Sequence, residues 1–312
     1  MEIIDSPDSL QKGTVAATIG MFDGVHRGHA SLINSLKKAA SANGLKSAVI
    51  TFNTHPQFVL NPHTDLKMIM SIDERLEAIR SLGPDDVILM NFTLSLSAMD
   101  AFEYIRYIRD HFGVAMLVIG YNHHFGHKSK ETFADYVRHG ETLGVKIEKA
   151  EEYIGPYSPV SSSVIRKLIT SGKVDDAKNC LGHPFTIHGE VVRGAGNGRK
   201  LGFPTANIGK IDPNIVIPHR GVYAVNVITA DGVRRQGMAN IGIRPTIEKD
   251  GAQSIEVNIL DFDADIYDQP IAAEFIKFFR SEKKMASIEK LRQQLEADKA
   301  TTRKILEEKQ SD

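Results

Sequence analysis

Cysteine is almost absent from this sequence, and neither sign of charge is in excess. Cys180 is the only cysteine among 312 residues, so the chain can form no internal disulfide and no cysteine-based zinc site. The 38 Lys and Arg residues against 39 Asp and Glu residues leave a formal net charge of −1. This balance lacks the electrostatic footprint of a dedicated binder of nucleic acids or anionic membranes. We therefore expect a protein of a reducing compartment with no nucleic-acid partner.

Long apolar runs are missing as well. No stretch approaches the roughly 20 apolar residues that a membrane-spanning helix needs. Residues 1–7 are acidic and interrupted by Pro7, unlike a signal peptide. We therefore expect a cytoplasmic protein without a membrane partner. Apolar residues make up 42% of the chain and charged residues 25%, as in ordinary globular proteins, and the length predicts about two domains.

The first half of the chain alternates β-rich stretches with helical patterns. Buried strands are predicted at 14–19, 47–52, 86–90 and 114–119. The helical patterns between them lie at 30–42, from Ser71 onward, and at 97–112. Ser71 and Glu74 have the spacing of a capping box, and Gly113 is the expected end of the last of these helices. The alternation predicts a Rossmann-like α/β domain with a mostly parallel sheet, whose ligands lie beyond the carboxyl ends of the strands.

The second half changes to consecutive strands. They are predicted at 187–193, 221–228, 234–241, 254–260 and 271–279. No helical pattern intervenes before 287–308, so we expect an antiparallel barrel or sandwich with a terminal helix. With a hinge at 181–184, the predicted domains are 1–182 and 183–312.

The first predicted strand runs directly into a loop rich in glycine and histidine, GMFDGVHRGH at 20–29. Its glycines allow the backbone to approach a ligand closely, and the helix that follows presents unpaired N–H groups to an anion. His26 and His29 are three residues apart and can donate hydrogen bonds into the same volume. We therefore predict a phosphate site here. The residues predicted to form it are Gly20, Phe22, Asp23, Gly28 and the two histidines.

A metal site and a helix-start loop with two incidental histidines are the alternatives for this loop. Zinc would need a third and a fourth ligand, for which His123, His124 and His127 are the candidates. Arg27 lies between His26 and His29 and would oppose a dication, which favours phosphate.

A hydroxyl cluster opens another predicted short helix, with the sequence VSSSVIR at 160–166. Ser162 and Ser163 lie near the helix start, and Arg166 follows one turn later. Hydroxyls at a helix start together with an arginine are suited to an oxyanion.

These motifs together resemble the bacterial bifunctional riboflavin kinase/FAD synthetase family over nearly the whole chain. The first half resembles its FMN adenylyltransferase module, a member of the H-x-G-H nucleotidyltransferase superfamily. The loop at 20–29, FNTHP at 52–56, the segment 120–126 and SSSVIR match in order. The resemblance implies that His26 and His29 contact the ATP phosphates. It also implies that Ser162, Ser163 and Arg166 close over the triphosphate.

The loop after Gly120 departs from the family pattern. The family commonly has Asp-Phe-Arg-Phe where this chain has Asn122, His123, His124 and Phe125. The resemblance implies that Asn122 binds the flavin.

A second glycine-rich segment begins the other half, GEVVRGAGNGRKLGFPTAN at 189–207. It lacks the Gly-Lys-Ser/Thr ending of a Walker A loop, and a hairpin with a glycine-rich turn is the alternative interpretation. Thr205 and Asn207 are two apart on an extended segment, so their side chains face the same side. A hydroxyl and an amide oxygen are suited to Mg²⁺.

This segment resembles the riboflavin kinase module nearly position for position. The resemblance implies that Gly194, Gly198 and Arg199 bind ATP phosphates and that Thr205 and Asn207 hold the Mg²⁺-nucleotide. Glu256 is then the implied catalytic base, and Arg280 lies on the flavin side. Asn258 stands where the family often has histidine.

The resemblance implies two reactions, both with ATP as co-substrate. The first phosphorylates riboflavin to FMN, and the second adenylylates FMN to FAD and releases pyrophosphate. The alternatives are an H-x-G-H nucleotidyltransferase with another acceptor, such as a phosphopantetheine or glycerol phosphate, and a flavin- or nucleotide-binding sensor without catalysis. The segment 284–287, KMAS, also invites comparison with class I aminoacyl-tRNA synthetases, but it precedes the last helix and predicts a helix start.

Overall fold

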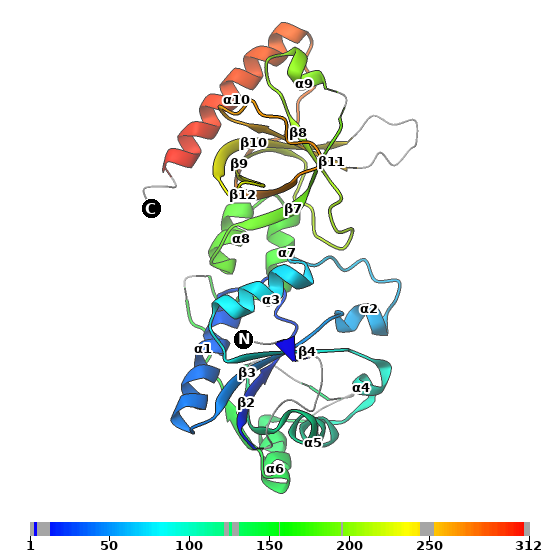
Figure 1. The fold of residues 1–312 in the computed structure, drawn as a ribbon, viewed down its shortest axis with the longest axis vertical. Helices are drawn as coiled ribbons and strands as arrows, with labels where there is room; N and C mark the ends of the chain where they lie inside the picture. The colour runs from blue at the N-terminus through cyan, green and yellow to red at the C-terminus, as the bar shows by residue number, and fades with distance from the viewer. Residues whose placement is uncertain are drawn as a thin grey trace. The chain divides into compact units, whose positions relative to one another are not determined.

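The computed structural model describes residues 3–4, 13–121, 125–126, 131–155, 157–194, 196–243 and 253–308. The chain divides into two compact units. The first comprises Met1–Leu66 and Met70–Ser161, and the second comprises Lys67–Ile69 and Ser162–Asp312. Figure 1 shows a different architecture in each: a sheet between helices in the first and a barrel with a long helix in the second.

The first unit is built on a parallel six-stranded sheet. Its strands are β1 (Ile3–Ile4), β2 (Val15–Ile19), β3 (Lys46–Phe52), β4 (Asp86–Met90), β5 (Val114–Ile119) and β6 (Lys146–Lys149). They lie in the order β1-β4-β3-β2-β5-β6. The strand order reverses between β2 and β5, so the loops that follow these two strands flank the switch point, where ligands bind in such sheets.

Helices cover both faces of this sheet (Figure 1). On one face lie α1 (Arg27–Ala42) and α3 (Ile72–Ser81), and on the other lie α5 (Ala101–Phe112) and α6 (Phe133–Leu143). Two short helices, α2 (Pro56–Leu60) and α4 (Leu94–Ala98), follow β3 and β4. Successive residues of β2 alternate between the two apolar cores, because side chains along a strand point to opposite faces. The predicted α/β architecture is therefore confirmed.

The ends of these helices follow local capping chemistry. Ser71 and Glu74 form the expected capping box at the start of α3. Gly113 ends α5 in the left-handed conformation, with φ 64°. The single helix expected from residue 97 is wrong, because Asp100 and Glu103 form a second capping box that starts α5 and separates it from α4.

The second unit is a closed barrel of antiparallel strands. The strands are β7 (Phe185–Val192), β8 (Ala206–Gly209), β9 (Gly221–Thr229), β10 (Arg234–Ile243), β11 (Gln253–Ile259) and β12 (Pro270–Arg280). Their order around the barrel is β10-β11-β8-β7-β12-β9. The terminal helix α10 (Ile288–Glu308) packs along β9 and β10, and its Leu306 is buried with Ala224 of β9 and Ile276 of β12. The barrel with a terminal helix is confirmed.

Three more helices belong to this unit. Helices α7 (Ser162–Thr170) and α8 (Val174–Leu181) pack against each other, and α8 packs on β12 and β7. The compact units therefore divide after Ser161, and the domain boundary expected at 182 stays a prediction. The four-residue helix α9 (Asn197–Lys200) was not expected, and neither was the short strand β8. Both are too short to show a period in the sequence.

Candidate active sites

The loop between β2 and α1 has an unusual backbone. Phe22 has φ 53°, Gly24 has φ 82° and Val25 has φ 37°. Positive φ is costly for a β-branched residue such as Val25, and it persists only where neighbouring contacts determine it. The Val25 amide donates to the Phe22 carbonyl at 3.0 Å, which closes the turn. The loop is thus held in one shape at the switch point of the sheet.

His26 and His29 meet at the start of α1. His26 is the N-cap residue, and its Nδ1 accepts a hydrogen bond from the His29 amide at 3.3 Å. The two imidazole rings stack, with centroids 3.6 Å apart. A Cβ at Gly28 would lie 3.2 Å from the His26 ring, so glycine leaves the space in which the ring folds over the helix start. The structure therefore brings together the two histidines of the H-x-G-H motif.

His26 is buried, and burial lowers its pKa from 6.5 to about 4. The ring is therefore neutral at neutral pH. Because Nδ1 accepts a hydrogen bond from the His29 amide, the single ring proton of neutral His26 lies on Nε2. His26 can thus donate from Nε2 to an oxyanion without bringing a charge of its own.

Two other predicted phosphate residues of this loop, Phe22 and Asp23, are each only 1% exposed. The Phe22 ring contacts the His29 ring edge to face, with centroids 5.0 Å apart. Asp23 Oδ1 accepts a hydrogen bond from the Met70 amide at 3.3 Å. Both side chains therefore contact the protein interior. A Cβ at Gly20 would lie 3.1 Å from the Phe22 ring, so this glycine serves the same packing.

The ends of β3, β4 and β5 lie at the same edge of the sheet. Asn53, directly after β3, donates from its backbone amide to the Met90 carbonyl and from its side chain to Asn91. His55 caps α2 by accepting a hydrogen bond from the Gln57 amide at 3.1 Å.

After β5, Tyr121 is exposed, and Lys149 Nζ lies 4.2 Å from the centroid of its ring. Asn122, His123, His124 and His127 lie outside the described residues.

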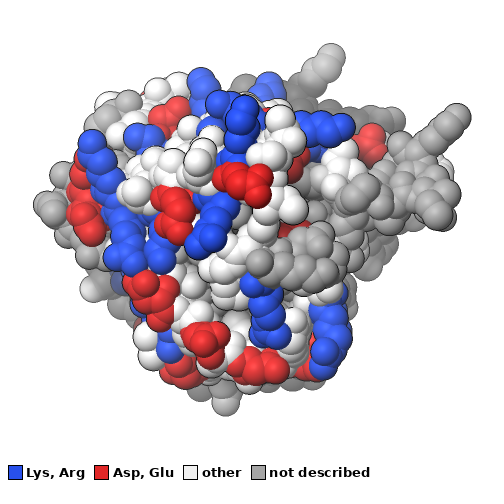
Figure 2. All heavy atoms as spheres, turned by 90° about the horizontal axis from the view of Figure 1, so that it is seen from above, with Lys and Arg blue, Asp and Glu red and all other residues white. Residues whose placement is uncertain are grey.

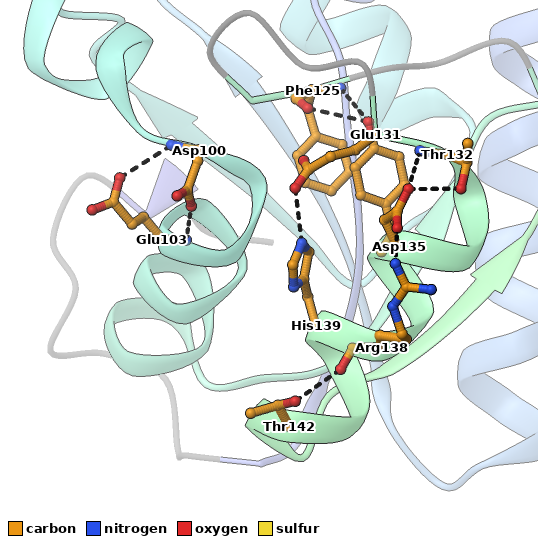
Figure 3. A network of polar contacts seen from close by, with 10 residues as sticks. Asp100, Glu103, Phe125, Glu131, Thr132, Asp135, Arg138, His139 and Thr142 are labelled. Atoms are coloured by element: carbon orange, nitrogen blue, oxygen red, sulfur yellow. Dashed lines mark hydrogen bonds and ion pairs between the residues drawn. The ribbon is translucent and has the colours of Figure 1, made fainter.

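Phe125, in the loop after β5, is held by contacts with Tyr136 of α6 (Figure 3). The Phe125 ring stacks on that of Tyr136 with centroids 4.5 Å apart, and the Tyr136 hydroxyl donates to the Phe125 carbonyl at 3.2 Å. On the same helix, α6, His139 pairs with Glu131 at 2.9 Å. The sequence interpretation missed Tyr136, although an aromatic residue in the apolar stripe of α6 is the available signal.

Ser162, Ser163 and Arg166 lie on the first two turns of α7, as the sequence predicts. Ser162 and Arg166 are half-buried, and Ser163 is exposed. This helix belongs to the second unit by packing.

In the barrel, Thr205, directly before β8, meets Glu256 of the neighbouring strand β11. The Thr205 hydroxyl donates to Glu256 Oε2 at 3.3 Å. Asn207, in β8, is the direct partner of Glu256 in β11, so the side chains of both face the same side as Thr205. A Cβ at Gly194 would lie 2.2 Å from Asn207 Nδ2, so any larger residue here would displace the Asn207 side chain. The structure thus brings together the predicted threonine, asparagine, glutamate and Gly194.

The glycine-rich loop folds tightly through α9. A Cβ at Gly198 would lie 2.3 Å from the Phe203 carbonyl oxygen and 3.3 Å from the Thr205 hydroxyl. Gly198 therefore lets the loop approach Thr205. Asn258 donates to the Pro204 carbonyl at 2.7 Å and so holds the other side of this threonine.

Two cavities share Thr205. The larger has a volume of about 290 Å³, and Gly198, Glu256 and Arg280 lie in its walls. The smaller has a volume of about 60 Å³, and Arg199, Phe262 and Tyr267 line it. Thr205 lines both, so it stands at the boundary between them.

Arg280 lies in the wall of the larger cavity but is paired with a residue that the sequence interpretation missed. Its Nε and Nη2 atoms donate to the two carboxylate oxygens of Asp298, the former at 2.8 Å. Asp298 is 2% exposed and also accepts from Gln294. The sequence feature that could have indicated Asp298 is its position on α10, where it continues the apolar stripe of Leu291 and Leu295.

The structure bears on two alternative interpretations only within the residues it describes, and the further zinc ligands considered above, His123, His124 and His127, lie outside them. Among the described residues, no group of three or more His, Cys, Asp and Glu side chains is arranged to hold a metal ion. The segment 284–287 lies before α10, where Ser287 Oγ accepts from the Lys290 amide at 3.2 Å as a helix cap does.

The first unit combines a parallel α/β sheet with the H-x-G-H loop, the features expected above of a nucleotidyltransferase, and the same chain carries a barrel with its own polar cavity. Family models match both parts, FAD synthetase over residues 8–164 and riboflavin kinase over residues 181–306. The chain belongs to the family of bifunctional riboflavin kinase/FMN adenylyltransferases.

Relatives described by that name match along most of their length. One from Listeria monocytogenes is 35% identical over 286 residues, which cover 91% of this chain and 90% of the relative. One from Bacillus subtilis is 35% identical and covers 95% of each chain. A solved structure from Streptococcus pneumoniae, described as a macrolide-efflux protein, has a TM-score of 0.86 and 30% identity and covers 97% of this chain and 98% of its own. None of the helices within the described ranges has the length and apolar character of a membrane span.

Proposed function

We propose that this chain makes FAD from riboflavin in two ATP-dependent steps. In the first, the barrel phosphorylates riboflavin to FMN. In the second, the α/β unit transfers AMP from ATP to FMN and releases pyrophosphate. Family membership supports both steps, and the sites described above supply a separate set of polar groups for each.

The observation that carries the kinase assignment is the position of Thr205 at the boundary of two cavities, with its hydroxyl donating to Glu256 in the wall of the larger one. We assign riboflavin to the larger cavity and the nucleotide to the side of Arg199 and Tyr267. The ribityl hydroxyl then attacks the γ-phosphorus of ATP beside Glu256, which accepts the hydroxyl proton, while the bond to the β–γ bridging oxygen breaks and ADP leaves. Gly194, Gly198 and Arg199 bind the phosphates, and Arg280, fixed by Asp298, lies on the flavin side.

The residues present fit a magnesium ion. Thr205, Asn207 and Glu256 offer a hydroxyl, an amide oxygen and a carboxylate on one side of the β8–β11 pair, and Mg²⁺ prefers oxygen ligands. Thr205 and Asn207 would hold it together with the nucleotide. When bound, Mg²⁺ neutralises charge on the transferred phosphate.

The adenylyltransferase step needs charge stabilisation but no base, because the FMN phosphate that attacks the α-phosphorus is already anionic at neutral pH. We assign phosphate contacts to Gly20, Gly28, His26 and His29 in the helix-start loop. The buried side chains of Phe22 and Asp23 stabilise the backbone of this loop. The neutral His26 ring is suited to donate from Nε2 to a phosphate oxygen. Ser162, Ser163 and Arg166 are assigned to the departing pyrophosphate, and Asn122 to the flavin.

The remaining assignments follow from composition. We propose a cytoplasmic enzyme whose partners are riboflavin, FMN and ATP rather than nucleic acid, with the two activities dividing near residue 182. On the face drawn in Figure 2, basic and acidic side chains alternate without a continuous patch of either sign, which is consistent with small-molecule substrates.

The test is to incubate the purified protein with Mg-ATP and either riboflavin or FMN and to separate the flavins by chromatography. We expect FMN and then FAD from riboflavin, and FAD alone from FMN. Failure to phosphorylate riboflavin would remove the kinase assignment, and failure to convert FMN would remove the other.

A further inference from the structure

Arg75 is the largest fully buried side chain of the described residues, and it carries a charge. It lies on α3 and is 1% exposed. Its neighbours on the buried face of the helix, Leu76 and Ile79, are apolar. Arginine is almost never fully buried unless it is paired, because an isolated charge in the interior is costly. The side chain therefore needs partners that justify its position.

The partners of Arg75 come from two different loops. Its Nη2 atom donates to the backbone carbonyl of Phe52, the last residue of β3. The carboxylate of Asp23 is as deeply buried, and its negative charge acts electrostatically on Arg75. Asp23 Oδ1 also accepts a hydrogen bond from the Met70 amide at 3.3 Å, next to the start of the helix that carries Arg75. Burial lowers the pKa of Arg75 to about 10 and the Asp23 charge opposes this effect, so the guanidinium remains protonated at neutral pH.

These two loops are the ones that the adenylyltransferase site requires. Asp23 lies in the β2–α1 loop three residues before His26, within the strained turn from Phe22 to Val25. Phe52 immediately precedes Asn53 and His55 at the carboxyl end of β3. A strained loop keeps its shape only if the surrounding contacts determine it. The start of α3 supplies such a contact, because the Met70 amide, just before the N-cap, donates to Asp23. Arg75 adds the attraction of its buried positive charge for the Asp23 carboxylate.

We propose that Arg75 is a positioning residue for the adenylyltransferase reaction, which joins the histidine loop to the end of β3 through Asp23 and the Phe52 carbonyl. It fixes the orientation of His26 and His29 relative to the segment after β3. Arg75 touches neither substrate. The inference rests on the function proposed above for this unit.

The first experiment compares Arg75→Met with Arg75→Lys in the full-length protein. The readouts are kcat and the KM values for ATP and FMN in FAD formation, together with the thermal midpoint. Methionine keeps much of the side-chain volume and removes the charge, so we expect kcat/KM for ATP to fall about 100-fold, the size of effect that a misplacement of about 1 Å can cause. Lysine keeps the charge, and we expect it to recover at least about tenfold of that loss. The control is Arg80→Met on the same helix, whose partner Glu77 is exposed, and we expect it to change kcat/KM less than twofold.

A purely structural role gives a different result. In that case Arg75→Met lowers the thermal midpoint but keeps kcat/KM within twofold of wild type well below that temperature, and the proposal is wrong. If Arg75→Met does not fold, Asp23→Asn provides the second test, because it removes the same charge pair while keeping the size of the side chain. We expect it to lower kcat/KM for ATP about tenfold or more, and an unchanged value would overturn the proposal.

The double variant Asp23→Asn/Arg75→Met should lose no more activity than the more damaging single variant, since each single substitution already removes the attraction between the two charges. Losses that multiply would mean that the two residues act independently, and the proposal would fail. A wild-type protein that makes no FAD from FMN would instead refute the proposed function itself.

Discussion

The imidazole rings of His26 and His29 lie face to face, 3.6 Å apart and within 15° of parallel. Two protonated rings at this separation would repel each other, and burial has already lowered the pKa of His26 to about 4. The pair therefore offers an oxyanion at least one neutral donor, and the following predictions test the roles of this pair and of the barrel site.

Replacing His29 with alanine should abolish most FAD synthesis while riboflavin phosphorylation continues. The substitution removes one donor near the phosphates and the ring on which His26 stacks, and loss of one such donor costs about 10²–10³ in rate. Initial rates with FMN and with riboflavin, measured on the same preparation, give the comparison. Equal losses in both reactions would indicate a shared site or misfolding.

The free energy of unfolding should fall as the solution is acidified from about pH 6.5 to about pH 4. The folded-state pKa of His26 is lowered to about 4, so in this window the unfolded chain binds a proton that the folded chain does not. The stabilising effect is fully present above pH 6.5, and up to about 3 kcal/mol is lost on reaching pH 4. Because carboxylates also titrate there, the measurement is the difference between wild type and His26→Gln in urea unfolding at each pH. A difference that does not change with pH would contradict the assignment of a buried neutral ring.

Glu256→Gln should show the reverse selectivity of the His29 variant. The glutamine amide keeps the shape of the glutamate side chain and can still accept a hydrogen bond from the Thr205 hydroxyl, but it cannot take the proton of the ribityl hydroxyl. We expect riboflavin phosphorylation to fall about 10²–10⁴-fold, the usual cost of losing a general base, and FAD formation from FMN to remain. Full retention of phosphorylation would remove the base role from Glu256.

Fragments separate the two modules and test the boundary. A fragment of residues 183–312 contains every strand of the barrel and should phosphorylate riboflavin. A fragment of 162–312 should do so with a higher thermal midpoint, because α8 buries Ala177, Cys180 and Leu181 in its packing on β7 and β12. Circular dichroism and the kinase assay decide between the possibilities. A shorter fragment that folds but is inactive would contradict the division near 182.

Periodic stretches were predictable from the sequence and isolated contacts were not. β4 and β5 begin and end where their apolar runs do, and Gly113 ends α5 as its conformational freedom suggests. Strand β8 and helix α9 are four residues long, so their shape is imposed by the barrel and by the close packing around Gly198. The spatial order of the barrel strands depends on pairings between distant segments, which no local pattern encodes.

The candidate site follows the same rule. Thr205, Asn207 and the two histidines were identifiable because their spacing is distinctive, and Glu256 only because the surrounding segments resemble the riboflavin kinase module. Arg75 and Asp298 were not, although each interrupts an apolar stripe on its helix. A single charge in such a stripe indicates that an opposite charge lies nearby, but the sequence does not show which residue carries it. Asp23 is 52 positions away from Arg75 in the chain, and Arg280 lies on β12 whereas Asp298 lies on α10.

The position of Thr205 in the walls of two cavities has a consequence for inhibitor design. Because the volumes adjoin at one small side chain, a flavin fragment and a nucleotide fragment joined by a short linker would form a bisubstrate compound. Its second half would bind at the high effective concentration that a short tether provides. Such a compound should bind the barrel far more tightly than either half alone. Thr205→Val, which replaces the hydroxyl with a methyl group at that junction, should weaken the linked compound more than either separate half, and equal effects in calorimetric titrations would show that the compound does not span the junction.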